Sequence, residues 1–167
     1  MFVESCRIPP KQPRNLYKFL CAAPSLAHFL FLHYNRTMNK VDCNREMLSL
    51  MQTIPRGTSL LLHSCCGPCS SRCLETLKDT FAVTVLYYNP NITDLAEYEK
   101  RKGEQIRFLR ETGWADFLDC DYNPAEFFAA AKGLEGEREG GARCYACYKL
   151  RLEYTARTAA EHGFGWF

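Results

Sequence analysis

The sequence has no long uncharged apolar run. No stretch of about 18 such residues occurs in the chain, which argues against a transmembrane helix. It also has no excess of one charge, since 21 Lys and Arg face 19 Asp and Glu for a net charge of +2. Such a balance neither demands nor excludes a polyanionic partner, because a protein of nearly neutral net charge can still have a basic surface on one side. No nicotinamide or flavin motif is present, so a redox role would need an external electron donor.

Cysteine, by contrast, is plentiful. The chain contains ten cysteines, a lower density than in small secreted disulfide scaffolds, and their spacing is paired rather than evenly dispersed. Five of them fall into two clusters, Cys65-Cys66-Gly67-Pro68-Cys69 and Cys144-Tyr145-Ala146-Cys147. Because sulfur-rich ligand sets favour zinc or iron–sulfur clusters, we expect a metal or redox centre here. The other cysteines are expected to be bystanders; they are Cys6, Cys21, Cys43, Cys73 and Cys120.

The first 37 residues differ in character from the rest. Basic residues precede an apolar stretch, superficially as in a signal peptide, but Pro24 and His28 interrupt that stretch and no small-residue cleavage site follows it. We expect Met38 to be the natural start and residues 1–37 to be a disordered extension or an over-long translation, with a targeting segment as the alternative. Residues 38–167 are then expected to form a single α/β domain, incomplete at its C-terminus.

Segments of helical and strand character alternate along the chain. The patterns predict helices at about 42–51, 68–79, 94–112, 124–131 and 144–161, and strands at about 59–63, 81–88, 117–120 and 163–167. Such alternation is typical of an α/β fold with a parallel sheet and flanking helices. Ligands of parallel sheets bind at the carboxyl ends of the strands. The first cysteine cluster directly follows the strand at 59–63, so we expect it at a ligand-binding position.

The residues alone leave three readings of the cysteine clusters open. A Cys66-Gly67-Pro68-Cys69 motif between strand and helix is typical of thioredoxin-like dithiol oxidoreductases, although their chemistry needs no second pair. Zinc modules usually separate their pairs by about 15–20 residues, whereas here residues 70 to 143, 74 in all, lie between them. An iron–sulfur cluster uses up to four thiolates and accounts better for five. We expect the adjacent Cys65 and Cys66 side chains to point in different directions and to serve two neighbouring centres.

Several sequence blocks surround the cysteines in a fixed order. They are Leu61-Leu62-His63-Ser64 before Cys65, Tyr87-Tyr88-Asn89-Pro90-Asn91-Ile92, Glu97-Tyr98-Glu99-Lys100-Arg101, Tyr122-Asn123-Pro124-Ala125-Glu126-Phe127, Lys132-Gly133-Leu134-Glu135, Glu139-Gly140-Gly141-Ala142-Arg143 before Cys144, and Arg151-Leu152 with Thr155-Ala156. Together, over roughly residues 38–167, they resemble the QueH-type epoxyqueuosine reductases. That family continues beyond the equivalent of Phe167, so the resemblance implies a truncated chain whose folding and activity alone are open.

The resemblance implies a specific reaction and cofactor. The implied protein is a cytosolic, cobalamin-independent enzyme that reduces epoxyqueuosine at the wobble position of tRNA to queuosine, the last step of queuosine biosynthesis. It would need an electron-donor protein and no membrane. The implied fold is similar to the adenine-nucleotide α-hydrolase (HUP) class, and the implied cofactors are a [4Fe–4S] cluster and an adjacent mononuclear metal, expected to be iron. The implied ligands are Cys65, Cys66, Cys144 and Cys147, with Cys69 next; which thiol binds which centre stays open.

Further polar residues are candidates for catalysis or substrate binding, each with a structural alternative. His63 could donate protons or be a core histidine with a satisfied hydrogen bond. Asn89 and Asn91 follow a strand, where they could bind substrate or simply form a turn. Tyr88 could stack on a base or belong to the core. Arg143 could contact a tRNA phosphate or the negative charge of a cluster, or it could lie on a solvated helix face.

Overall fold

The computed structural model describes residues 42–167. Residues 1–37 and Met38, which we expect to be the natural start, lie outside the described residues. The chain divides into two units, one ending at Ile54 and one beginning at Pro55, and each is described by itself. Within the described part, no helix has the length and apolar character that crossing a membrane would need.

The first unit contributes one described helix, α2 (Cys43–Met51). The helix begins after Asp42, whose carboxylate accepts a hydrogen bond from the backbone N–H of Arg45 at 3.1 Å. This is the usual way in which an aspartate satisfies a free backbone donor at a helix start. The helix predicted over 42–51 is thereby confirmed.

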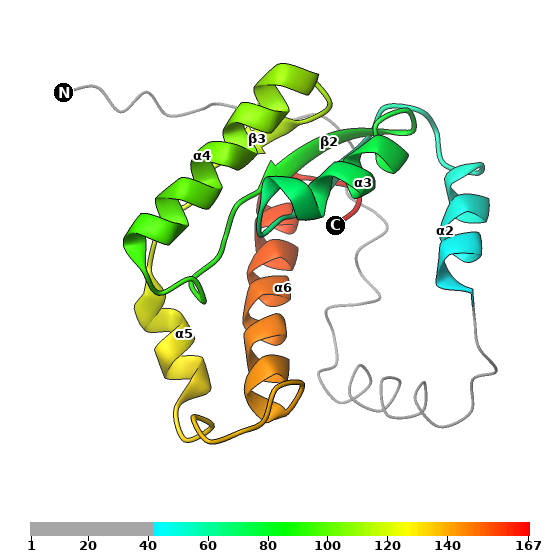
Figure 1. Cartoon of the computed structure of the whole chain (residues 1–167). Coiled ribbons are helices and arrows are strands. Elements are labelled where there is room, and N and C mark those ends of the chain that lie inside the picture. Colours follow the sequence, from blue (N-terminus) through cyan, green and yellow to red (C-terminus); the bar gives the residue numbers. More distant parts are fainter. Residues whose placement is uncertain (1–41) are drawn as a thin grey trace. The chain divides into compact units, whose positions relative to one another are not determined.

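The second unit is built around a three-stranded parallel sheet (Figure 1). Its strands are β1 (Thr58–His63), β2 (Phe81–Leu86) and β3 (Asp116–Leu118), in the order β1-β2-β3. Thr58 pairs with Phe81, and Thr84 pairs with Asp116. Because all three strands run the same way, their carboxyl ends share one edge of the sheet. The predicted α/β fold with a parallel sheet is confirmed, and the HUP class stays a prediction.

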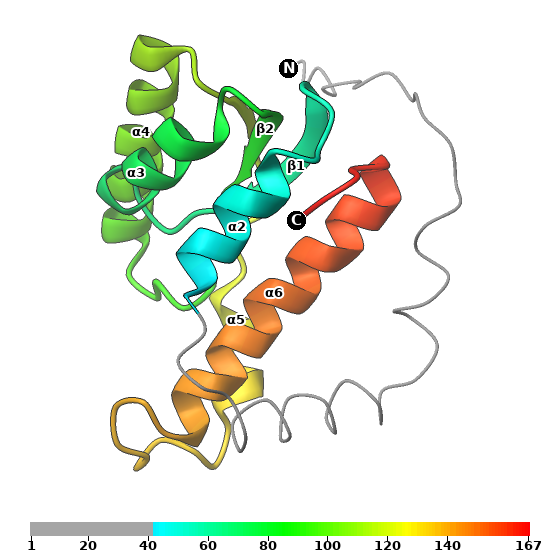
Figure 2. The same cartoon turned by 90° about the vertical axis from the view of Figure 1, so that its right-hand side faces the viewer.

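Helices connect the strands and cover both faces of the sheet. They are α3 (Gly67–Leu77), α4 (Leu95–Thr112), α5 (Pro124–Ala131) and α6 (Ala142–His162). α3 and α4 pack against each other on one face, and α6 packs against β1 from the opposite face (Figures 1 and 2). Parallel neighbours can be joined only by a crossover, so α3 and α4 are the crossovers that this strand order requires.

Side chains of the strands alternate between the two helical layers. Toward α6 lies a buried hydrophobic cluster made of Leu61, Leu86, Tyr88, Ala159 and Phe164. On the opposite face the ring of Tyr87 lies 5.3 Å from that of Tyr98 in α4. β2 ends at Leu86, two residues before the predicted strand end, yet the alternation continues through Tyr87 and Tyr88. These two tyrosines therefore anchor the loop after β2 to both layers.

Capping residues mark the ends of the two longest helices. At the start of α4 the Asp94 carboxylate accepts a hydrogen bond from the backbone N–H of Glu97 at 2.8 Å. α4 ends at Gly113 with φ of 62°, and α6 ends at Gly163 with φ of 73°. This left-handed conformation is strained for residues that carry a Cβ, which explains glycine at both stops. The predicted stop of the long charged helix at Gly113 is confirmed.

The segment predicted as a fourth strand makes one parallel bridge. Trp166 bridges to Leu60 of β1. The Trp166 backbone N–H donates to the Ser59 carbonyl at 3.2 Å, and its carbonyl accepts from the Leu61 N–H at 2.9 Å. Since β2 occupies the other edge of β1, these bonds make β1 an interior strand. The strand that leads into the first cysteine cluster is thus held on both sides.

Candidate metal centre

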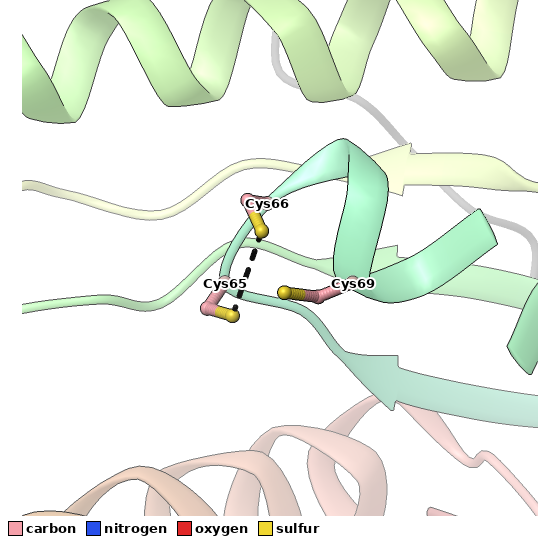
Figure 3. Close-up of side chains that lie close together, drawn as sticks. All are labelled: Cys65, Cys66 and Cys69. Atoms are coloured by element: carbon pink, nitrogen blue, oxygen red, sulfur yellow. Dashed lines mark hydrogen bonds between the residues drawn. The ribbon is translucent and has the colours of Figure 1, made fainter. Parts of the chain in front are cut away.

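The turn between β1 and α3 gathers three thiols (Figure 3). β1 ends at His63, the chain bends at Cys65, and α3 begins at Gly67 with Cys66 as its N-cap. The sulfur atoms of Cys65, Cys66 and Cys69 all lie within 4.8 Å of one another. Across residues 42–167, no other group of three or more His, Cys, Asp or Glu ligand atoms is as compact. The first cysteine cluster therefore has the geometry of a metal-binding group.

The expectation that Cys65 and Cys66 point in different directions is wrong. Their sulfur atoms are 3.9 Å apart, within hydrogen-bond distance for thiols, as the dashed line in Figure 3 marks. Adjacent side chains diverge on a regular strand, but the chain bends at Cys65, beyond the end of β1. The two thiols can therefore act on one centre rather than on two.

The pKa values of Cys66 and Cys69 are shifted in opposite directions. Burial raises the pKa of Cys66, but hydrogen bonds from Cys69 and Cys65, together with the positive charge of Arg101, outweigh burial and leave that pKa below its ordinary value. The pKa of Cys69 is raised to about 12, chiefly because its thiol is hydrogen-bonded to Cys66 and Cys65. Cys66 is thus easier to deprotonate than Cys69. Since thiolates are the metal-binding form, metal binding would release protons from the ligand thiols.

This donor set fits a thiophilic metal or an iron–sulfur cluster. Three sulfur donors without a carboxylate favour zinc, copper(I) or iron–sulfur centres over magnesium or calcium. Three protein ligands on a tetrahedral metal leave one position for water, substrate or a further ligand. The group therefore suits the kind of cofactor that the sequence implies, without choosing between zinc and iron.

The second cysteine pair lies at the start of α6, outside the compact thiol group. Cys144 and Cys147 are half-buried, and their spacing of three residues places them on the same face of the helix. The backbone N–H of Gly140 donates to the Cys144 sulfur at 3.4 Å. Arg151, one turn further on, donates to the Cys147 carbonyl at 3.4 Å and is close enough to His63 for its charge to affect that imidazole. The second pair is thus on the helix that packs beside the end of β1.

His63 is tied to the loop after β2. Its Nε2 lies 2.8 Å from the Tyr88 carbonyl, and because a carbonyl can only accept, Nε2 carries the hydrogen. Burial lowers the pKa of His63; the bond to Tyr88 raises it and the charge of Arg151 lowers it. The imidazole is therefore neutral near pH 7. This arrangement matches the alternative reading of a core histidine with a satisfied hydrogen bond.

The ring of Tyr88 is buried between elements. It stacks on Tyr154 of α6 with centroids 3.7 Å apart, and its hydroxyl donates to the carboxylate of Glu126 in α5. Burial raises the pKa of Tyr88, and Glu126 raises it further. Tyr154 and Glu126 are absent from the residues predicted from sequence. Glu126 belongs to the sequence block Asn123-Pro124-Ala125-Glu126, and membership of that block was the sequence feature that could have indicated it as a site residue.

Asn89 and Asn91 lie in the loop that follows β2. The Ile92 N–H donates to the Asn89 carbonyl at 3.1 Å, as in a turn. Asn89 is buried, and its Nδ2 donates at 2.8 Å to the carbonyl of Ser64, the residue before Cys65. The Oδ1 atoms of both asparagines are buried without a hydrogen-bond partner. Asn89 thus braces the cysteine turn, a contact that no sequence pattern indicates.

Arg143 lies in the first turn of α6, beside the second cysteine pair. One of its Nη1 hydrogens is directed at the Glu135 carbonyl, 3.3 Å away. This bond ties the glycine-rich loop at 133–141 to the helix. The guanidinium has five donors in all, so this contact does not use its full capacity.

Comparison with known proteins decides the family. The family model described as "Epoxyqueuosine reductase QueH" matches residues 60–167, more than half of the chain. The chain belongs to the QueH family. It is 43% identical over 128 residues to the epoxyqueuosine reductase QueH of Haemophilus influenzae, covering 75% of the chain and 52% of that protein. It is 45% identical over 116 residues to that of Histophilus somni, covering 68% and 47%.

A third relative is less similar in sequence but matches over a longer segment. The chain is 36% identical over 140 residues to the epoxyqueuosine reductase QueH of Staphylococcus epidermidis, covering 80% of the chain and 59% of that protein. The chain therefore spans about half the length of the curated relatives it matches. The region matched by the QueH model begins within β1 and includes both cysteine pairs, so the candidate metal centre lies wholly inside it.

Proposed function

We propose that this chain forms the metal-binding part of an epoxyqueuosine reductase that converts epoxyqueuosine in tRNA to queuosine. The proposal rests chiefly on the convergence of Cys65, Cys66 and Cys69 at the end of β1, within the region matched by the family. Removing an epoxide oxygen to leave a double bond consumes two electrons and two protons and releases water. Because the chain has no nicotinamide or flavin motif, an electron-donor protein is proposed as a partner.

A [4Fe–4S] cluster with an adjacent mononuclear iron is the proposed cofactor. When bound, it supplies single-electron transfer and a Lewis acid for the epoxide oxygen. The proposed ligands are Cys65, Cys66, Cys144 and Cys147, with Cys69 next. Packing of α6 on β1 supports the participation of the second pair. The compactness of the first group supports a larger role for Cys69 than sequence alone suggests.

The proposed substrate is a tRNA with epoxyqueuosine at the wobble position, bound at the carboxyl edge of the sheet in the cytosol. The buried Oδ1 of Asn91 has no hydrogen-bond partner, which supports Asn91 as a substrate contact. Arg143 is supported by the N–H donors of its guanidinium that its bond to the Glu135 carbonyl does not use. Tyr88 could stack on a base only if Tyr154 moved away from it. His63 holds its hydrogen on Nε2 against a carbonyl, so it would have to take up a proton at Nδ1 before it could donate one to the substrate.

Anaerobic purification followed by iron analysis tests the cofactor. We expect a brown protein with several irons per chain. Cys66→Ala and Cys147→Ala should lose iron and should lose conversion of epoxyqueuosine-tRNA, measured by mass spectrometry of the released nucleosides. Cys73→Ala is the matched control, because Cys73 is an exposed cysteine of the same helix α3.

Three outcomes would contradict the proposal. Retention of iron and activity in both cysteine variants would refute the ligand assignment. A colourless protein with a single bound zinc would indicate a structural zinc site. A metal-free protein that reduces insulin disulfides would indicate a dithiol oxidoreductase using Cys66 and Cys69.

A further inference from the structure

A buried glutamine of α4 contacts the residues on either side of the first thiol group. Gln105 has no exposed surface. Its Oε1 lies 2.8 Å from the hydroxyl of Ser64 and 3.0 Å from that of Ser70. Ser64 immediately precedes Cys65, and Ser70 immediately follows Cys69. Both serines are themselves buried, each with 4% of its surface exposed.

The same two hydroxyls also lie against backbone carbonyls of the turn. Ser64 Oγ is 3.3 Å from the Cys66 carbonyl, and Ser70 Oγ is 3.0 Å from the Gly67 carbonyl. Each hydroxyl has only one hydrogen, so it cannot donate both to Gln105 and to a carbonyl. With Oε1 facing the serines, the Nε2 of Gln105 is buried without a partner. That arrangement leaves two donor hydrogens unused in a site without water access, which is unfavourable.

Turning the carboxamide by half a revolution resolves this conflict. The rotation exchanges Nε2 and Oε1, which have nearly the same shape and cannot be told apart by geometry alone. Nε2 then donates one hydrogen to Ser64 and one to Ser70. Each serine is thereby free to donate to its backbone carbonyl. All four hydrogens find acceptors, and a single amide oxygen is left over.

The backbone around this network allows close approach of the two helices. Gly67 is buried at the start of α3. A Cβ on this residue would lie 3.5 Å from the Glu104 carbonyl and 3.8 Å from the Cβ of Phe108. The turn thus rests directly on α4, and a larger side chain than alanine at Gly67 would push it away from Gln105.

We propose that Gln105 is a positioning residue that holds the Cys65–Cys69 turn in its ligand-gathering shape through hydrogen bonds donated to Ser64 and Ser70. The proposal rests on the proposed function in taking Cys65, Cys66 and Cys69 as ligands. The new proposal goes beyond that function because it assigns the arrangement of the three cysteines to a residue that binds no metal.

The test uses Gln105→Leu, which keeps a similar volume and removes all hydrogen bonding, in the whole chain. Ile106→Ala is the control, because Ile106 is an exposed neighbour in the same helix. Anaerobic titration with Co²⁺ alone reads the thiol group through its thiolate-to-metal absorption. We expect Gln105→Leu to weaken Co²⁺ binding by about tenfold or more, as loss of two hydrogen bonds allows, and to alter the spectrum. Ile106→Ala should match the parent chain.

A second measurement separates this proposal from the proposed function. The Ser70 amide donates to the Cys66 carbonyl at 3.2 Å, so its hydrogen exchange in the metal-free chain reports the turn directly. Gln105→Leu should speed that exchange at least severalfold. If the parent chain fails to bind Co²⁺, the proposed metal centre is wrong, and the exchange rate still decides the role of Gln105.

Serine variants keep the test valid if Gln105→Leu does not fold. Ser64→Ala and Ser70→Ala should each weaken Co²⁺ binding severalfold even then, and unchanged affinity in both would overturn the proposal. Where Gln105→Leu folds, the serine effects should not add to its effect. Unchanged Co²⁺ affinity, spectrum and Ser70 exchange in a folded Gln105→Leu chain would overturn the proposal. So would full additivity of the serine and glutamine effects.

Discussion

Replacing two glycines of α4 by alanine, one at a time, should change the stability of the chain in opposite directions. Gly103 lies inside the helix, is exposed, and has no atom within 4 Å of the position that a Cβ would take. Gly113 ends the same helix with φ of 62° and likewise has open space around it. The added methyl group meets no obstacle at either site, so only the backbone conformation distinguishes the two substitutions.

The magnitudes follow from that backbone difference. Alanine in a helix interior is favoured over glycine by about 0.5–1 kcal/mol, so Gly103→Ala should stabilise the chain by that amount. A residue with a Cβ costs about 1–2 kcal/mol in the left-handed conformation. Alanine also restricts the unfolded chain more than glycine does, which offsets part of this cost, so Gly113→Ala should destabilise the chain by roughly 1 kcal/mol. The two variants should therefore differ by about 1.5–2 kcal/mol in free energy of unfolding.

Urea unfolding followed by far-ultraviolet circular dichroism measures both values in the metal-free chain. The double variant should lie between the single ones, since the two sites are far apart on the helix and share no partner. A shift of the same sign in both variants would refute the reasoning. An unchanged stability of Gly113→Ala would mean that the helix does not end in the left-handed conformation described for it.

Three further outcomes are expected. Burial raises the pKa of Cys120 to about 12, and its thiol donates a hydrogen bond to a backbone carbonyl at 3.0 Å. We therefore expect Cys120 to resist iodoacetamide at pH 8 until the chain unfolds, whereas the exposed Cys73 should react at once. Equal labelling of the two cysteines would contradict the burial of Cys120. Leu61→Ala, at a fully buried position of β1, should cost about 2–5 kcal/mol of stability in urea, whereas Leu152→Ala at an exposed position should cost less than about 0.5 kcal/mol. Asp94→Ala should cost about 1 kcal/mol by removing the cap of α4, and Asp94→Asn should retain most of it; equal losses in both would contradict the capping role.

The layout of the second unit was largely predictable from the sequence. Its strands are short apolar runs bounded by turn residues, and its two longest helices, α4 and α6, both end at glycines. Local signals of this kind need no tertiary information. The prediction of divergent Cys65 and Cys66 side chains failed because the chain leaves the strand after His63 and bends at Cys65, where the alternation of a regular strand no longer applies.

The partners of the thiol group could not be predicted in this way. Gln105 lies in a helix rich in charged residues, a pattern that normally indicates a solvated face. It is buried on the side of α4 that packs against α3 and the sheet, a contact between elements that the sequence pattern does not reveal. Glu126 and Tyr154 meet Tyr88 only after α5 and α6 fold onto the sheet. Contacts between residues distant in sequence leave no periodic trace in a single chain.

The hydrogen bonds that shape the cysteine turn have a consequence for the order of events during synthesis. Asn89 and Gln105, which hold Ser64 and Ser70, both precede β3 in the chain. The ribosome therefore delivers both side chains that hold the three-thiol turn before α6 and the second cysteine pair emerge. A nascent chain at this stage already presents a soft three-sulfur ligand set, with one face of the sheet still uncovered. The proposed metal would therefore meet the three thiols of this turn earlier in synthesis than Cys144 and Cys147.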